Sequence, residues 1–362
     1  MSKKMIIAGG GTGGHIFPAI AIAHALQEKD PSIRILFVGA KGKMEMEKVP
    51  QAGYKIEGLD IAGFNRSSLI KNISLPVKLI KSFIQVKKIF KSFRPDAVIG
   101  VGGYSTFPVL RYAQSKGIPT FIHESNSFAG KANILLGKKA TTIFTATDGM
   151  EKFFPAAKII ITGNPVRQAI ASMNISRKAG LDFFSLPENK LTVLVIGGSL
   201  GAKSINEAIL AHYKELLGAG LQLIWQTGKT LAKEAAEIAV EHRDIWAAPF
   251  ITEMQYAYAA ADIIMARAGA MTVAEITVAK KPVVFVPYPF AAEDHQTMNA
   301  LQLVNKGAAW LVKDSDAKES AVAKIIELAK DAATRNYMAE VLGTLSITNA
   351  DERIAGEILK RI

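Results

Sequence analysis

The segment that decides the fold is residues 5–15, MIIAGGGTGGH, in which a short apolar run leads into a glycine-rich turn. Glycine lets a backbone approach a ligand closely. A helix that starts after such a turn presents free N–H groups and a partial positive charge. Residues 191–202, LTVLVIGGSLGA, repeat the arrangement in the second half of the chain. The two segments predict two similar α/β domains that face a shared cleft, each with an anion site.

Apolar strands alternate with helical stretches along the whole chain. The predicted strands are residues 5–8, 33–38, 97–100, 119–122, 142–145 and 159–162 in the first half, and 191–196, 221–226, 262–265, 282–286 and 309–312 in the second. Continuous apolar runs are typical of parallel strands that are buried on both faces. The pattern therefore predicts an α/β fold with two doubly wound parallel sheets. A linker is expected at residues 163–167, where Gly and Pro interrupt the alternation.

Composition and charge limit the class of protein. The 362 residues include no cysteine, which excludes disulfides, thiolate nucleophiles and Cys-ligated zinc. No apolar run reaches the roughly 20 residues that span a bilayer, so we expect a protein that is soluble or lies on a membrane surface. Residues 1–164 hold 23 of the 44 Lys and Arg, but only 10 of the 32 Asp and Glu. This excess indicates either a polyanionic partner, nucleic acid or an anionic membrane, or a surface tuned for solubility.

The first glycine loop also matches a dinucleotide motif, because Gly9, Gly11 and Gly14 satisfy G-x-G-x-x-G. A fold that binds NAD would add an acidic residue at the end of the second strand. Residues 31–44 contain none, which argues against a dehydrogenase. His15 follows the last glycine, at the start of the predicted helix, where a neutral imidazole can accept a proton from an attacking hydroxyl.

Further polar clusters follow the predicted strands. They are residues 102–105, 123–126, 267–275, 287–289 and 293–299. Cleft residues of α/β proteins come from such strand ends, and these clusters are rich in the amides and hydroxyls that bind sugar hydroxyls.

Seven motifs carry a resemblance that covers nearly the whole chain. They are GGTGGH (10–15), GGYST (102–106), HESN (123–126), GNPVR (163–167), GGSLGA (197–202), ARAGAMTVAE (266–275) and DHQTMNA (294–300). In this order and spacing they resemble the MurG family of peptidoglycan glycosyltransferases. The resemblance implies a GT-B fold of two Rossmann-like domains. Residues 1–163 plus 344–362 would take the acceptor lipid I, and residues 164–343 would take UDP-N-acetylglucosamine (UDP-GlcNAc).

The reaction that the resemblance implies inverts the anomeric centre. The muramyl 4-hydroxyl of lipid I attacks C1 of the donor sugar, UDP leaves, and a β-1,4 bond gives lipid II. His15 is the expected base, with His123 and Glu124 as rivals. No cofactor is implied. Helix N-termini and Arg can stabilise the departing UDP, and no D-x-D carboxylate pair is present to hold a metal.

The motifs also imply which residues bind the substrate. Glu275 is expected to hold the ribose hydroxyls, with Arg167 assisting at the diphosphate. Gln296 is expected to contact GlcNAc hydroxyls with support from Asn299, while Asn126 approaches the donor sugar from the other domain. The other expected contacts are Thr12, Gly13, Gly14, Ser199 and Gly201 in the glycine loops, Phe250 and Ile251 as a uracil platform, and Ala270, Met271 and Thr272 at a helix start. His295 stands where the family often has an amide.

Residues 69–94 predict a surface that meets a membrane. No acidic residue lies between Asp60 and Asp96, and this stretch mixes Lys and Arg with apolar residues. The helical stripe is Leu75, Leu79, Phe83, Val86 and Phe90. We expect Leu69, Ile70, Ile73 and one flank of the helix to enter lipid while lysines meet anionic head groups. This would place the protein peripherally on the cytoplasmic face of the inner membrane. The alternative is an ordinary helix that packs on the sheet and has solvated lysines.

Other functions remain as alternatives. A UDP-GlcNAc 2-epimerase would share the donor side, but it would not need a basic and apolar acceptor domain. A nucleic-acid-binding protein is suggested by charge alone, without an RNA platform, helix–turn–helix or zinc signature. The expected partners are UDP-GlcNAc, lipid I and an anionic membrane surface, with other cell-wall synthesis proteins left open and nucleic acid not expected.

Overall fold

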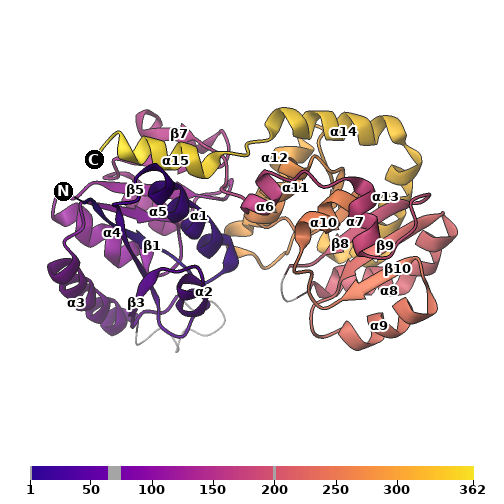
Figure 1. The fold of residues 1–362 in the computed structure, drawn as a ribbon, viewed down its shortest axis with the longest axis horizontal. Coiled ribbons are helices and arrows are strands. Elements are labelled where there is room, and N and C mark those ends of the chain that lie inside the picture. The colour runs from indigo at the N-terminus through magenta and orange to yellow at the C-terminus, as the bar shows by residue number, and fades with distance from the viewer. Residues whose placement is uncertain (1, 64–74, 199–200) are drawn as a thin grey trace. The chain divides into compact units, whose positions relative to one another are not determined.

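The computed structural model describes residues 2–63, 75–198 and 201–362. The chain divides into two compact units, Met1–Val166 with Asn349–Ile362, and Arg167–Thr348 (Figure 1). The boundaries expected from the sequence, after residues 163 and 343, lie a few residues earlier. The second of them falls inside α14 (Ala332–Leu345), whose Leu342 is buried in the core of the second unit.

The first unit is built on a seven-stranded sheet with the order β3-β2-β1-β4-β5-β6-β7, in which every pairing is parallel. Its strands are β1 (Lys4–Ala8), β2 (Arg34–Ala40), β3 (Lys55–Leu59), β4 (Ala97–Gly100), β5 (Thr120–Glu124), β6 (Thr142–Thr145) and β7 (Ile159–Ile161). Its helices are α1 (Gly13–Lys29), α2 (Glu45–Gln51), α3 (Leu75–Phe93), α4 (Thr106–Ser115), α5 (Lys131–Gly137), α15 (Ala350–Leu359) and the 3-10 turns η2 (Met150–Lys152) and η3 (Ala156–Lys158).

Alternation along β1 explains why helices cover both faces of this sheet. Met5 and Ile7 belong to one apolar cluster with residues of α1 and α15, whereas Ile6 and Ala8 belong to another with residues of α3 and α4. Successive side chains of a strand point to opposite faces, so a run of four fully buried residues requires a layer on each side. The C-terminal helix α15, yellow in Figure 1, supplies part of one layer.

The second unit repeats this plan on a six-stranded parallel sheet with the order β10-β9-β8-β11-β12-β13. Its strands are β8 (Leu191–Ile196), β9 (Leu221–Gln226), β10 (Ile245–Ala248), β11 (Ile263–Ala266), β12 (Val283–Phe285) and β13 (Trp310–Leu311). Its helices are α6 (Gln168–Ala171), α7 (Arg177–Phe183), α8 (Lys203–Gly218), α9 (Ala232–Glu241), α10 (Met254–Ala260), α11 (Ala270–Ala279), α12 (His295–Val304), α13 (Ala317–Lys330), α14 and the 3-10 turns η4 (Ala292–Asp294) and η5 (Asp314–Asp316).

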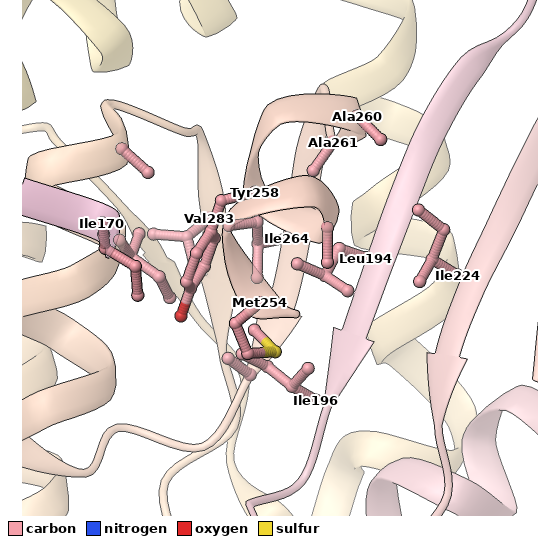
Figure 2. Packing of buried hydrophobic residues seen from close by; sticks show 14 of the residues in the cluster. Ile170, Leu194, Ile196, Ile224, Met254, Tyr258, Ala260, Ala261, Ile264 and Val283 are labelled. Carbon is pink, nitrogen blue, oxygen red and sulfur yellow. The ribbon is translucent and has the colours of Figure 1, made fainter. Parts of the chain in front are cut away.

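The core of this unit again has two layers. Val193 and Val195 of β8 pack with residues of α8 and α13, and Leu194 and Ile196 pack with residues of α10, α11 and α12. Figure 2 shows part of the second layer, in which Tyr258 lies among aliphatic side chains.

Strand order locates the functional loops. In the first sheet the direction of strand succession reverses between β1 and β4, and in the second between β8 and β11. Ligands of open α/β sheets bind at the carboxyl ends of strands beside such a switch point. The loops there are those that follow β1, β4, β8 and β11, and all four belong to the glycine or polar clusters predicted from the sequence.

The edge strands β3 and β10 are absent from the sequence prediction. β3, Lys55–Leu59, alternates exposed and partly buried residues before ending at a buried leucine, and β10 is only partly buried after Ile245. β3 does not form the continuous apolar run that identifies a central parallel strand. β10 is apolar throughout, but it has only four residues and is followed directly by Pro249, which interrupts a strand pattern. Within the described residues, no helix combines the length and apolar character needed to cross a membrane.

Candidate functional site

In the first unit, the glycine loop after β1 packs directly against the loop after β4. The N–H of Gly10 donates to the carbonyl of Gly102 across 3.2 Å. A Cβ on residue 103 would lie 2.2 Å from the Gly10 oxygen, and φ of Gly103 is +90°, so a side chain is excluded there. The structure therefore brings together two clusters that lie far apart in the sequence.

A buried carboxylate, Glu45, holds the first loop. Its Oε2 accepts from the N–H of Gly11 at 2.8 Å, and its Oε1 accepts from the N–H of Ala40 at 2.9 Å. The side chain is only 1% exposed. Glu45 is not predicted from the sequence. It lies one residue beyond the stretch 31–44, in which a dinucleotide fold would place the acidic residue that binds a ribose. The usable signal is a carboxylate in the first turn of the helix that follows β2.

His15 lies at the start of α1, beside both loops. Its Nδ1 is 3.2 Å from the Gly10 carbonyl oxygen and 3.4 Å from Thr12 Oγ1. A carbonyl can only accept, so the neutral ring donates from Nδ1 to Gly10 and carries its lone pair on Nε2. A Cβ on Gly102 would lie 2.7 Å from Nε2 and Cδ2, which shows that the imidazole lies against this glycine.

The other two candidates for the base are engaged differently. Glu124 is 3% exposed, and both of its oxygens accept hydrogen bonds. Oε1 accepts from the backbone and side-chain nitrogens of Asn126 at 3.1 and 3.3 Å. Oε2 accepts from Gly130 N at 3.1 Å and Asn133 Nδ2 at 2.8 Å. With four donors around it, the carboxylate orients Asn126 and is poorly placed to take a proton from a substrate.

His123 is 1% exposed within β5. Burial, with a contribution from the nearby His15, lowers the pKa of His123 to about 4. The ring is therefore neutral at physiological pH, but it is not accessible to a large acceptor. Of the three candidates for the base, only His15 is partly exposed.

In the second unit, the glycine loop after β8 packs closely against neighbouring backbone, as the loop after β1 does in the first unit. A Cβ on Gly201, where φ is +79°, would lie 2.3 Å from the Thr227 carbonyl oxygen. The N–H of Gly201 donates to Gly198 O across 3.0 Å, and α8 begins just afterwards at Lys203. Ser199, an expected phosphate contact, lies outside the described residues.

Gln226, at the end of β9, joins this loop to the expected uracil platform. Its Nε2 donates to Gly198 O at 2.9 Å, and its Oε1 accepts from the N–H of Ile251 at 3.1 Å. The side chain of Ile251 is 2% exposed and belongs to the core, whereas Phe250 is 53% exposed. The Phe250 ring is therefore open to a ligand, whereas the Ile251 side chain is not. Gln226 is not predicted from the sequence, because it looks like one more residue of a buried strand.

Glu275 lies in α11 and is bound by two side chains. Arg167 donates to both of its oxygens, from Nε to Oε1 at 2.9 Å and from Nη2 to Oε2 at 3.1 Å. Tyr258 donates from its hydroxyl to Oε2 at 3.0 Å. Burial opposes the charge of Arg167, but the Glu275 carboxylate outweighs it and raises the pKa of Arg167. The structure thus brings together the two charged residues that the sequence assigned to ribose and diphosphate.

The remaining expected donor contacts gather around the start of α11. This helix begins at Ala270 and has no acidic residue in its first turn, so its partial positive charge is available to an anion. Met271 and Thr272 complete that turn. Asn299 donates to Ala268 O at 3.2 Å, and Gln296 accepts from the N–H of Tyr288 at 3.0 Å. Both amides therefore brace the loops that precede α11 and follow β12.

Arg267 connects these loops through hydrogen bonds and an ion pair. Its Nη1 donates to the carbonyls of Val286 and Pro287 at 2.9 and 3.1 Å and pairs with Asp314, while its Nη2 donates to Ser204 at 3.0 Å. It links the start of α8 to the loops after β11 and β12. Among the residues that the structure covers, no group of three or more His, Asp or Glu is arranged to hold a metal ion.

Two family models match the chain. Residues 5–145 match the glycosyltransferase family 28 N-terminal domain, and residues 192–354 match its C-terminal domain. Among solved structures, MurG of Acinetobacter baumannii superposes with a TM-score of 0.82 at 30% identity, over 99% of both chains. A UDP-GlcNAc 2-epimerase of Neisseria meningitidis reaches a TM-score of 0.69 at 17% identity, over 99% of this chain and all of that one, which reflects a shared fold.

Curated relatives narrow the family further. A protein of Phocaeicola vulgatus is 48% identical over 99% of this chain and 96% of its own length. A protein of Cytophaga hutchinsonii is 45% identical over 99% of this chain and 97% of its own length. Both carry the name UDP-N-acetylglucosamine–N-acetylmuramyl-(pentapeptide) pyrophosphoryl-undecaprenol N-acetylglucosamine transferase. The chain has the GT-B fold and belongs to this family of transferases, the MurG family, within glycosyltransferase family 28.

Proposed function

We propose that this chain transfers GlcNAc from UDP-GlcNAc to the muramyl 4-hydroxyl of lipid I and so forms lipid II. The relatives named for this transfer match nearly the full length of the chain. The observation that carries the assignment of the donor site is the buried carboxylate of Glu275, one turn into a helix that starts at the switch point of the second sheet. A nucleotide needs one group for its ribose and another for its phosphates, and this arrangement supplies both.

On the donor side, Glu275 accepts hydrogen bonds from the ribose hydroxyls. The N-terminus of α11 and the loop before α8 receive the diphosphate, with the Arg167 cation beside them. Phe250 contacts the uracil, and the Nε2 group of Gln296 contacts a sugar hydroxyl. As the sugar leaves, charge develops on UDP, and fixed N–H groups and Arg stabilise it without reorganisation.

On the acceptor side, His15 is the general base. The muramyl 4-hydroxyl attacks C1, its proton passes to Nε2 of His15, and the C1–O bond to UDP breaks with the electron pair leaving on the phosphate. One displacement of this kind inverts C1 and gives a β-1,4 bond. The hydrogen bond from Nδ1 to Gly10 holds the tautomer that this step needs. Asn126, oriented by Glu124, lies in the same unit and contacts the donor sugar.

The protein attaches peripherally to an anionic membrane through α3, on the cytoplasmic face where its soluble donor is available. Val77, Ile80 and Ile84 are 68%, 63% and 53% exposed. Their spacing places them on one side of the helix, whereas Ser82, Val86 and Phe90 are buried on the other.

The exposed side of α3 continues toward the C-terminus of the helix with Lys87, Lys88 and Lys91. An exposed apolar stripe flanked by lysines fits a lipid surface with anionic head groups. The expected contacts Leu69, Ile70 and Ile73 lie outside the described residues.

The test of this function compares incubations with and without acceptor. With lipid I, label from the sugar of UDP-GlcNAc should move into the lipid fraction. With UDP-GlcNAc alone, the sugar nucleotide should stay unchanged. Conversion to an isomeric UDP-sugar in the absence of acceptor would instead support the epimerase alternative.

A further inference from the structure

Tyr258 is the one buried hydroxyl that contacts the Glu275 carboxylate in the described part of the second unit. It lies in α10, is 0% exposed, and packs in the apolar core drawn in Figure 2, where its oxygen is red. That oxygen lies 3.0 Å from Oε2 of Glu275. Burial and the Glu275 charge raise the pKa of Tyr258 well above its usual value. The hydroxyl is therefore a permanent donor.

A count of lone pairs shows why this contact matters when a nucleotide binds. Each carboxylate oxygen accepts about two hydrogen bonds. Oε2 already receives one from Arg167 and one from Tyr258, and Oε1 receives one from Arg167. A ribose that donates one hydroxyl to each oxygen must therefore displace at least one bond of Arg167. The Arg167 side chain is 37% exposed and can move, whereas Tyr258 is enclosed by the core.

We propose that Tyr258 is a positioning residue for nucleotide binding, whose buried hydroxyl keeps the Glu275 carboxylate aimed at both ribose hydroxyls after Arg167 has yielded. The proposal rests on the proposed role of Glu275 as the ribose ligand. It assigns Tyr258 a part in distinguishing ribose from deoxyribose, although Tyr258 itself does not touch the nucleotide.

The experiment is isothermal titration of the full chain with UDP and with 2′-deoxy-UDP. In wild type, UDP should bind at least about 10-fold more tightly, because the deoxy analogue loses a hydrogen bond to a charged group. Tyr258→Phe removes one oxygen and keeps the ring. It should weaken UDP binding about 10-fold and reduce the UDP preference several-fold. Tyr256→Phe is the matched control, since this partly buried tyrosine lies in the same helix and its ring stacks on Phe183 at 4.5 Å. It should leave both affinities unchanged.

Two further measurements separate positioning from a general loss of structure. The binding stoichiometry gives the folded fraction, so a less stable Tyr258→Phe protein still yields a valid ratio of affinities. In a Glu275→Gln background, Tyr258→Phe should have little further effect on UDP affinity, because its influence passes through Glu275.

The possible failures are distinguishable. If wild type binds the two nucleotides equally, the assignment of Glu275 to the ribose is wrong. If wild type prefers UDP and Glu275→Gln removes the preference, while Tyr258→Phe keeps it in full, the proposal for Tyr258 alone is overturned. Additive effects of the two substitutions would also overturn it.

Discussion

The burial of His123 predicts a pH-dependent loss of stability in the first unit. The pKa of His123 is about 4 in the folded protein and 6.5 in the reference state. As pH falls below 6.5, His123 binds a proton in the unfolded chain but not in the folded protein. The free energy of unfolding therefore decreases as the pH is lowered to about 4. Between pH 7.5 and pH 5, linkage with these two values gives a loss of about 2 kcal/mol from this residue.

His123→Leu removes the titrating group and keeps an apolar side chain in the core. Whatever constant cost this change carries, the difference in unfolding free energy between wild type and variant should shift by about 2 kcal/mol between pH 7.5 and pH 5, in favour of the variant at low pH. Other titrating groups cancel in that difference. His24→Leu, which removes an exposed histidine of the same unit, is the control.

The assay must report on the first unit alone. All three tryptophans, Trp225, Trp246 and Trp310, lie in the second unit, so their fluorescence does not follow the first. Hydrogen exchange of peptides that cover β5, measured at increasing urea, gives the opening free energy of the sheet around His123. Parallel pH dependences for wild type and His123→Leu would mean that the imidazole binds its proton equally in the folded and unfolded chain, so that burial does not lower its pKa.

Three other predictions concern the proposed reaction and the proposed membrane contact. Glu275→Gln should raise the KM for UDP-GlcNAc and weaken UDP binding by titration, since it weakens charge-assisted bonds to the ribose; unchanged UDP affinity would remove Glu275 from the site. His15→Ala should lower kcat by about 10²–10⁴-fold and leave UDP affinity nearly unchanged, as seen in saturating turnover assays; a change in KM alone would assign His15 to substrate binding instead. Ile80→Glu with Ile84→Glu should reduce co-sedimentation with anionic liposomes, whereas Val240→Glu, at an 88% exposed position of α9, should not; attachment that ignores salt and lipid charge would contradict the role of α3.

The fold could largely be predicted from the sequence, because most central strands are apolar runs and β1, β4 and β8 lead directly into glycine-rich loops. β3 could not, because its residues are mixed in polarity and only partly buried, and β10 could not, because its apolar run is only four residues long and ends at Pro249. The apolar stripe that helical spacing predicts in α3, Leu75, Leu79, Phe83, Val86 and Phe90, is buried or partly buried, as expected of a helix that packs on the sheet. The exposure of Val77, Ile80 and Ile84 is instead a property of the packed helix, which sequence spacing alone does not determine.

The candidate site could likewise be predicted only in part. Motifs identify the residues at strand ends, but not the residues that position them through hydrogen bonds. Glu45, Gln226 and Tyr258 act through contacts with residues far away in the sequence, and each looks ordinary in its local pattern. At the expected uracil platform, the motif names Phe250 and Ile251 alike, but it does not tell that the Ile251 side chain is buried whereas the Phe250 ring is exposed. Burial of His123 likewise depends on the strands beside β5.

The most direct test of the proposed transfer is the stoichiometry and linkage of one reaction. Purified protein is incubated with lipid I and UDP-GlcNAc labelled in the sugar, and both the release of UDP and the product linkage are measured. We expect one UDP to be released for each labelled GlcNAc that enters the lipid, and the sugar to be joined to the muramyl 4-oxygen by a β bond. UDP release without transfer to lipid, or an α-linked product, would contradict the proposed transfer.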